Sequence, residues 1–258
     1  MLSIARHIRW LIKAQLGINA GQLIRSIRGI PRYVRDYFRF RKGYRGRLEW
    51  RPCLHDWYEE GGSTRSEYFW QDLIVARMIF RANPRRHVDV GSRIDGFVAH
   101  VASFREIDVI DVRPVTARVP GIVFRQMDLA RGTPSDAIYD SASCLHALEH
   151  FGLGRYGDDV DPMGYATGLA NLAGLLAPQG KLYLSVPVGR ARVEFNAHRV
   201  FDPRELVDLA SQNALQLISL SAVSSGGELE VFEPAETAFA ELARREYTLA
   251  ILVFQKGG

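Results

Sequence analysis

From His87 onward, short apolar runs alternate with longer segments of helical periodicity. The runs are too short for helices and predict strands at 88–90, 107–110, 122–127, 137–145, 182–186, 215–222 and 248–254. Apolar residues spaced three and four apart predict helices between the strands, at 96–103, 162–177, 203–213 and 235–246. Strands alternating with helices favour a parallel sheet, so the pattern predicts an α/β, doubly wound Rossmann-like domain.

The first 84 residues follow a different pattern. Leu23, Ile27, Ile30 and Val34 would share one face of a helix in a segment rich in arginine. An irregular, aromatic-rich stretch follows and leads to a predicted helix at 66–81, which Pro84 ends. We therefore predict a basic amphipathic helical extension at 1–51, a cap or lid segment at 52–84, and an α/β domain at 85–258.

Charge is distributed unevenly between these parts. Residues 1–51 contain 13 Lys/Arg and two acids, a net charge of +11 within a chain total of +4, which leaves −7 for the rest. A basic amphipathic helix can lie on anionic lipid headgroups or bind nucleic acid phosphates. Because no RNA-binding fingerprint is visible, we favour a membrane surface over nucleic acid. The alternative is a helical cover packed on the domain, with its arginines solvated.

Two features indicate the cellular compartment. Cys53 and Cys144 form neither a CxxC pair nor a zinc pattern, which fits a reducing environment. No apolar stretch approaches the roughly 18 to 20 residues that span a bilayer. We expect a cytoplasmic protein, with peripheral contact at the inner membrane face as the role of the basic extension.

The turn after the first predicted strand of the domain indicates a nucleotide site. Gly91 allows a sharp turn there, and Asp111 ends the next strand 22 residues after Asp89, near the spacing at which a carboxylate binds ribose hydroxyls. A GxGxxG fingerprint is absent, which argues against a pyrophosphate dinucleotide. The alternative is an ordinary strand-to-helix turn.

The ordered motifs at 89–91, 111, 127–129, 145–150 and 176–187 resemble those of class I S-adenosylmethionine-dependent methyltransferases. The resemblance is closer still to a methyltransferase-like family known as domain of unknown function 268. Its hallmarks look like DVGSRIDGF, GLGRYGD and SVPVGRxRVxFNAHRVFDP, which stand here at 89–97, 152–158 and 185–203. The resemblance implies a seven-stranded sheet whose last strand is antiparallel, and S-adenosylmethionine as the cofactor.

The resemblance also implies roles for individual residues. Asp89 and Gly91 would lie against the amino acid part of the cofactor and Asp111 would bind the ribose hydroxyls, while Asp128 would accept from the adenine amino group beside the backbone of Leu129. The remaining members of the expected cofactor loop are Ser92, Arg93 and Gly96. As an alternative, a strand-end aspartate such as Asp128 often caps a helix or forms a turn.

The loop departs from the methyltransferase pattern at Arg93 and Asp95, where close backbone approach to the cofactor is expected. Arg93 could pair with Asp95 or with the cofactor carboxylate. If its side chain instead fills the pocket, the site would take a smaller or more anionic nucleotide, or nothing.

A second group of residues follows the fourth predicted strand. His146, Glu149 and His150 should lie at the carboxyl edge of the sheet, where doubly wound domains build sites. His150 or His146 could remove a proton from a substrate hydroxyl, with Glu149 orienting the histidine or a substrate amine. Alternatively, these residues cap the following helix.

Two loops should converge above this edge. They carry the candidate substrate-binding residues Arg155, Tyr156, His198 and Arg199. Arginines suit sugars or phosphates. Asp158, Asp161 and His198 could in principle bind a metal, but the acids belong to a helix-capping run and we expect no metal.

These observations lead to one favoured function and two alternatives. We expect a methyltransferase acting on a hydroxyl or amine of a glycan, a glycolipid precursor or another small polar molecule. The alternatives are an RNA methyltransferase, and a non-catalytic methyltransferase-like binding or scaffold protein in envelope polysaccharide assembly.

Overall fold

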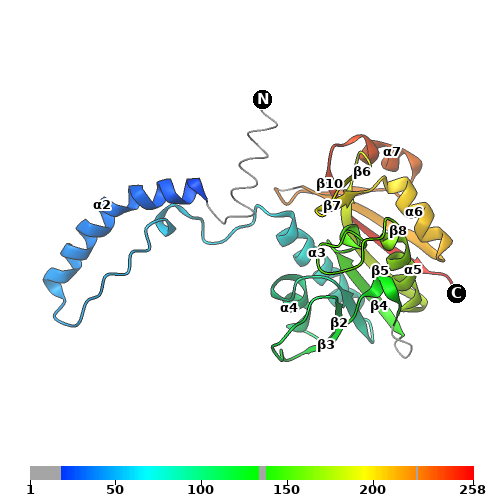
Figure 1. Cartoon of the computed structure of the whole chain (residues 1–258), viewed down its shortest axis with the longest axis horizontal. Coiled ribbons are helices and arrows are strands. Elements are labelled where there is room, and N and C mark those ends of the chain that lie inside the picture. The colour runs from blue at the N-terminus through cyan, green and yellow to red at the C-terminus, as the bar shows by residue number, and fades with distance from the viewer. Residues whose placement is uncertain (1–18, 134–137, 225) are drawn as a thin grey trace. The chain divides into compact units, whose positions relative to one another are not determined.

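A computed structural model describes residues 19–133, 138–224 and 226–258 of the chain (Figure 1). The chain divides into two compact units, residues 1–63 and 64–258. Helix α3, Glu67–Ala82, lies in the second unit. Within the described residues, no helix is both long enough and apolar enough to cross a bilayer.

In its described residues, the first unit consists of a helix and a returning segment without strands, which contains the 3-10 turn η1, Asp56–Tyr58. Helix α2, Ala20–Gly43, begins at Asn19, whose side chain accepts from the Gln22 amide at 3.2 Å. The returning segment packs on one side of the helix, where Tyr37 stacks on Trp50 with ring centroids 4.2 Å apart. A Cβ at Gly29 would lie 2.2 Å from the Leu54 carbonyl oxygen, so glycine permits this close approach.

The second unit contains an eight-stranded sheet in the order β3-β2-β1-β4-β5-β10-β8-β9 (Figure 1). The strands are β1 His87–Val90, β2 Ile107–Asp111, β3 Ile122–Gln126, β4 Tyr139–Leu145, β5 Leu176–Val188, β8 Leu215–Val223, β9 Leu229–Phe232 and β10 Thr248–Lys256. Strands β1 to β5 run parallel to one another, whereas β10 runs antiparallel between β5 and β8. The predicted α/β class and antiparallel last strand are therefore confirmed.

The predicted number of strands is wrong, because the sheet has eight strands rather than seven. The additional strand, β9, pairs with β8 at the edge of the sheet. Val231 is 75% exposed, and such a short edge strand leaves no buried apolar run in the sequence. A separate hairpin, β6 Arg192–Glu194 with β7 His198–Val200, lies in a segment that we expected to be a loop.

Helices cover both faces of the sheet. Along β10, Leu249, Ile251 and Val253 pack into the core beneath α3 and α4 (Ala99–Ala102). The alternate residues Ala250, Leu252 and Phe254 join the core beneath α5 (Gly164–Gly174), α6 (Pro203–Gln212) and α7 (Glu236–Arg244). Because successive strand residues point to opposite faces, these two cores define a three-layer domain.

Candidate functional site at the carboxyl edge

Asp89, at the end of β1, is fully buried and faces β4 and its own loop. Its carboxylate accepts from the Ser143 hydroxyl at 2.6 Å and from the hydroxyl and amide of Ser92 at 2.8 and 3.0 Å. Burial raises the pKa of Asp89 to about 7. His87 lies between the Ser141 and Ser143 hydroxyls, and burial lowers its pKa to about 3. The hydrogen bonds between Asp89 and Ser92 thus stabilise the turn that follows β1.

Gly91 makes the turn that the sequence predicts. Its φ is +79°, and a Cβ there would lie 2.7 Å from the Ala147 Cβ, so a side chain does not fit. Arg93 pairs with Asp95 through two hydrogen bonds of 2.9 and 2.6 Å. Both side chains are about 70% exposed, so Arg93 does not fill a pocket.

Helix α3 contacts the loop after β1. A Cβ at Gly96 would lie 2.7 Å from Asp72 Oδ2, so a larger residue there would require the Asp72 side chain to shift. Burial raises the pKa of Asp72, and the Gln71 side-chain amide donates to its other oxygen at 2.9 Å. Gln71 Oε1 is buried and has no hydrogen-bond partner among the described residues. A buried acceptor without a partner is free to receive a donor from a ligand.

Asp111, the expected ribose acceptor, lies at the end of β2 and already holds an arginine. Its Oδ1 accepts from the backbone amide and Nε of Arg113 at 2.8 and 3.0 Å, and its Oδ2 accepts from Nη2 at 2.6 Å. Nη2 also donates to the Gly91 carbonyl at 3.2 Å. Arg113 therefore links the Asp111 carboxylate, at the end of β2, to the Gly91 carbonyl, directly after β1.

Asp128 has a local structural role in this structure. Its Oδ1 accepts from the Ala130 amide at 2.9 Å and caps the 3-10 turn Leu129–Arg131. Its Oδ2 lies 3.6 Å from Arg131 Nε. Leu129 is buried, and its carbonyl accepts from the side-chain amide of Asn171, on α5, at 2.7 Å. These contacts correspond to the capping alternative, while the assignment of Asp128 to adenine stays a prediction.

His146 ends β4 at a tight turn, with φ of +52°. Its Nδ1 lies 2.6 Å from Glu149 Oε1 and its Nε2 lies 3.6 Å from Glu67 Oε1. Burial opposes the charged imidazolium, but Glu149 and Glu67 outweigh it and raise the pKa of His146 to about 9. Burial likewise opposes the Glu149 carboxylate, yet His146 lowers its pKa. The pair is therefore ionised at neutral pH.

Tyr247 joins this network from the other end of the chain. Its hydroxyl donates to Glu67 Oε1 at 2.5 Å. It directly precedes β10, and because β10 is antiparallel, the start of this strand lies at the carboxyl edge of β1 to β5. His198, on β7, packs against the Tyr247 ring and lies 3.8 Å from Glu194.

His150 differs in charge from His146. Its Nδ1 lies 2.7 Å from the Ala197 carbonyl, which fixes Nδ1 as the protonated nitrogen. Burial and the nearby Arg155 guanidinium lower the pKa of His150, so the ring is neutral at pH 7. Nε2, which lies 3.7 Å from Glu149 Oε1, then carries the free lone pair. His150 meets the electronic requirement for a general base.

The loop 152–158 is built around one carboxylate. Asp158 accepts from the backbone amides of Gly152, Gly154 and Tyr156 at 3.0 to 3.1 Å. Both glycines have positive φ, so the loop curls around Asp158. Both oxygens of Asp158 are engaged with the loop backbone, which explains the motif without a metal ion.

Tyr156 contacts both the Asp111–Arg113 pair and His150. Its ring lies 5.5 Å from the His150 ring, and the guanidiniums of Arg113 and Arg155 lie 4.7 and 5.1 Å from its centroid. Arg199 points elsewhere, because its guanidinium donates to the main-chain carbonyls of Glu149, Phe151 and Pro162. The structure thus brings Asp111, His150, Arg155 and Tyr156 together, while Arg199 fastens the loop to β7.

Three members of the network were absent from the sequence prediction. Glu67 and Tyr68 stand at the start of α3, where the Tyr68 ring lies 4.3 Å from His146. Tyr247 is the third. Its position before an antiparallel last strand is the one sequence signal for it. The start of α3 carries no such signal.

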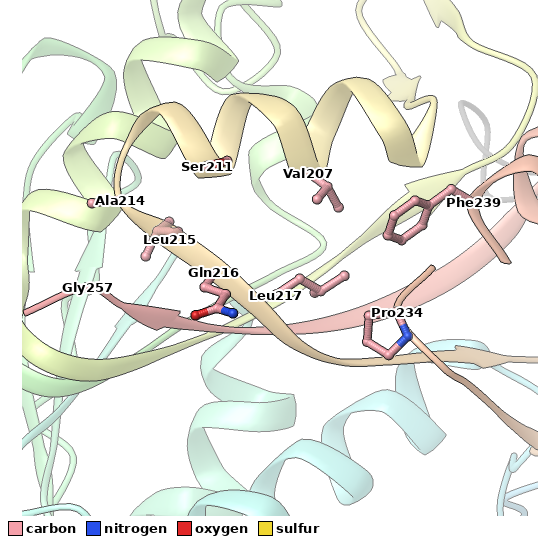
Figure 2. A pocket seen from close by; sticks show the side chains of 9 residues that line it. All are labelled: Val207, Ser211, Ala214, Leu215, Gln216, Leu217, Pro234, Phe239 and Gly257. Carbon is pink, nitrogen blue, oxygen red and sulfur yellow. The ribbon is translucent and has the colours of Figure 1, made fainter. Parts of the chain in front are cut away.

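A separate hollow of about 510 Å³ lies between α6, β8 and the chain around Pro234 (Figure 2). Its walls are mostly apolar, with Val207, Leu217 and Phe239 facing the space. None of its lining residues belongs to the network described above.

Residues 123–218 match the family model described as "Caenorhabditis protein of unknown function, DUF268". The resemblance to this family is therefore confirmed over a segment that contains β4, the loop 152–158 and the β6–β7 hairpin. No curated protein matches the sequence.

Solved structures share the fold. One is the 1,6-didemethyltoxoflavin-N1-methyltransferase of Burkholderia thailandensis with 1,6-didemethyltoxoflavin and S-adenosylhomocysteine bound, with TM-score 0.54, 16% identity, and coverage of 79% of this chain and 81% of that one. Another is the 4+2 cyclase SpnF, with TM-score 0.52, 16% identity, and coverage of 72% and 81%. The domain therefore has the Rossmann-like methyltransferase fold. Because a methyltransferase and a cyclase both match, the fold alone does not define the reaction.

Proposed function

We propose that this protein transfers the methyl group of S-adenosylmethionine to an oxygen or nitrogen atom of a small polar substrate. The observation that carries the proposal is the junction at Tyr156, where a ribose acceptor, Asp111, and a neutral histidine, His150, meet at one edge of a methyltransferase-fold sheet. In parallel α/β sheets, ligands bind at this edge.

The residues at the edge fit the cofactor. Gly91 lets the backbone turn closely beside Ala147 at the end of β1, and Asp111 ends the neighbouring strand. The buried side-chain atoms that have no hydrogen-bond partner among the described residues include Gln71 Oε1, His146 Nε2 and Glu149 Oε2. In this proposal Asp111 holds the ribose, and the turn around Gly91 and Ser92 holds the methionine part.

Methyl transfer is an in-line displacement at carbon, for which the bound cofactor supplies the activated methyl group. His150 Nε2 takes the proton of a substrate hydroxyl as its oxygen attacks the methyl carbon, or takes a proton from a substrate ammonium before the free amine attacks. The Ala197 carbonyl holds the tautomer that leaves Nε2 unprotonated. Glu149 Oε1, at 3.7 Å, stabilises the imidazolium that results. His146 keeps Glu149 ionised and in place.

The substrate that we propose is a glycan, a glycolipid precursor or a similar polar molecule near a membrane. The support is the combination of cationic and aromatic side chains at the site with a basic extension. On α2, Leu23, Ile27, Ile30 and Phe38 are each 46 to 58% exposed and lie along one face. Arginines at 25, 28, 32, 35 and 39 follow the opposite face. We propose that this helix lies on an anionic lipid surface.

The test is calorimetric titration of the full chain with S-adenosylmethionine and S-adenosylhomocysteine, with NADH as the comparison ligand. Binding of the two sulfur compounds but not of NADH is expected. Asp111→Asn should weaken this binding by roughly 1.5 to 3 kcal/mol, because a charge-assisted hydrogen bond is lost. The matched control is Asp202→Asn, since Asp202 holds Arg204 in nearly the same geometry away from the site.

One observation favours a second function. Arg113 occupies much of the hydrogen-bonding capacity of Asp111, as expected of a non-catalytic relative whose nucleotide site has closed. A protein of this kind would bind a partner in envelope polysaccharide assembly. Absence of binding by all three ligands would favour this second function and contradict the first.

A further inference from the structure

In the proposed function Asp111 binds the cofactor ribose, yet in this structure its carboxylate is bonded to Arg113. Asp111 is nearly buried, with 8% of its side chain exposed, whereas the Arg113 side chain is 38% exposed. Asp111 Oδ1 already accepts two hydrogen bonds and Oδ2 one. A ribose with two hydroxyl donors therefore competes with the guanidinium for the carboxylate, because each oxygen accepts about two hydrogen bonds.

Arg113 also has a second partner, Tyr156, which it contacts while it is bonded to Asp111. Its guanidinium lies over the Tyr156 ring, and Arg155 lies over the same ring. Among the described residues, neither Nη1 of Arg113 nor Nε and Nη2 of Arg155 has a hydrogen-bond partner. Arg155 also has no carboxylate partner there, and Asp158 is turned towards its own loop backbone. Two guanidiniums with free donors thus share one aromatic platform.

We propose that Arg113 and Arg155 bind a phosphate or carboxylate group of the substrate, and that Arg113 becomes available for it when Asp111 binds the cofactor ribose. This inference rests on the proposed function and names its substrate class. Guanidinium donors match both anions in bidentate geometry. A half-buried guanidinium that has lost its carboxylate also gains more from an anion than one that is still paired.

The proposal makes cofactor and anion binding cooperative. The cofactor ribose takes Asp111 and so frees Arg113 for the anion, and the anion takes Arg113 and so frees Asp111 for the ribose. Coupling is reciprocal, so an anion must tighten cofactor binding by the same factor. Typical couplings of this kind span about five- to 150-fold. An anion that merely screens charge would have no such effect at constant ionic strength.

The experiment measures the dissociation constant of S-adenosylhomocysteine for the full chain in potassium chloride, potassium phosphate and potassium acetate of equal ionic strength. We expect phosphate or acetate to tighten binding by about fivefold or more relative to chloride. The stronger of the two anions identifies the group. In Arg113→Gln and in Arg155→Gln, the difference between chloride and the stronger anion should disappear.

Arg204→Gln is the matched control, because Arg204 bonds Asp202 through its backbone amide, Nε and Nη2 at 2.9, 3.0 and 2.6 Å, as Arg113 bonds Asp111. This variant should keep the full gain. Equal dissociation constants in all three salts, or an equal gain in every variant, would overturn the inference and leave the proposed function intact. If S-adenosylhomocysteine bound in none of the three salts, both the inference and the proposed function would be overturned. Arg113→Lys, which keeps the charge without the bidentate fork, should restore only part of the gain.

Discussion

His150 is the residue whose protonation state most directly concerns the proposed reaction. Burial and Arg155 lower its pKa from the ordinary value of 6.5, so the base form persists below that pH. We predict that the acidic limb of the kcat/KM profile lies below pH 6.5. His150→Gln should lower kcat by about two to four orders of magnitude, the usual contribution of a general base. S-adenosylhomocysteine affinity should not change, and an unchanged kcat would refute the assignment.

His146 has a structural charge that can be measured through stability. Its folded-state pKa of about 9 exceeds the ordinary value of 6.5, so its contribution to stability is fully present below pH 6.5 and is lost as pH rises through 9. The shift corresponds to roughly 3 kcal/mol. Urea unfolding across this range should show a fall in the free energy of unfolding that is absent in His146→Gln. Parallel curves for the two proteins would contradict the buried ion pair.

At the scale of the elements, the turn between β1 and the following helix depends on Gly91. Gly91→Ala combines a left-handed backbone, costing about 1 to 2 kcal/mol, with a Cβ contact of 2.7 Å on Ala147, costing about 1 to 3 more. Gly157→Ala is the control, because its φ is +88° and a Cβ there meets nothing within 4 Å. Chemical unfolding should show the larger loss for Gly91→Ala. Equal losses would mean that the turn relaxes away from Ala147.

For the molecule as a whole, the separation of charge predicts where the protein binds. Residues 1–51 carry +11 while the remainder carries −7. We predict sedimentation with vesicles containing phosphatidylserine but not with pure phosphatidylcholine, weakening as salt rises. Arg28→Glu with Arg39→Glu should abolish sedimentation, whereas Arg118→Glu with Arg244→Glu, the same change of charge in the second unit, should lower it only slightly. Binding to an RNA oligonucleotide without vesicle sedimentation would favour nucleic acid instead.

The fold was predictable in outline because buried strands and helices leave periodic apolar patterns. The succession of β1 to β5, β8 and β10 along the chain follows from those patterns, and the antiparallel last strand follows once the family resemblance is added. Strands β6, β7 and β9 were missed because each has only three or four residues, and β6 and β9 are also largely exposed.

By itself, the sequence determined which residues stand at the ends of strands: Gly91, Asp111 and His146 follow from periodicity and spacing. Only the tertiary structure decided what these residues face. Asp111 meets Arg113, and His146 meets Glu67, whose other partner, Tyr247, lies 180 residues away from it in the chain. Periodicity is a local property that each segment carries in its own side chains. The partner and the charge state of a side chain depend on the burial and on the charged groups that distant segments bring to it. These are fixed only when the sheet assembles.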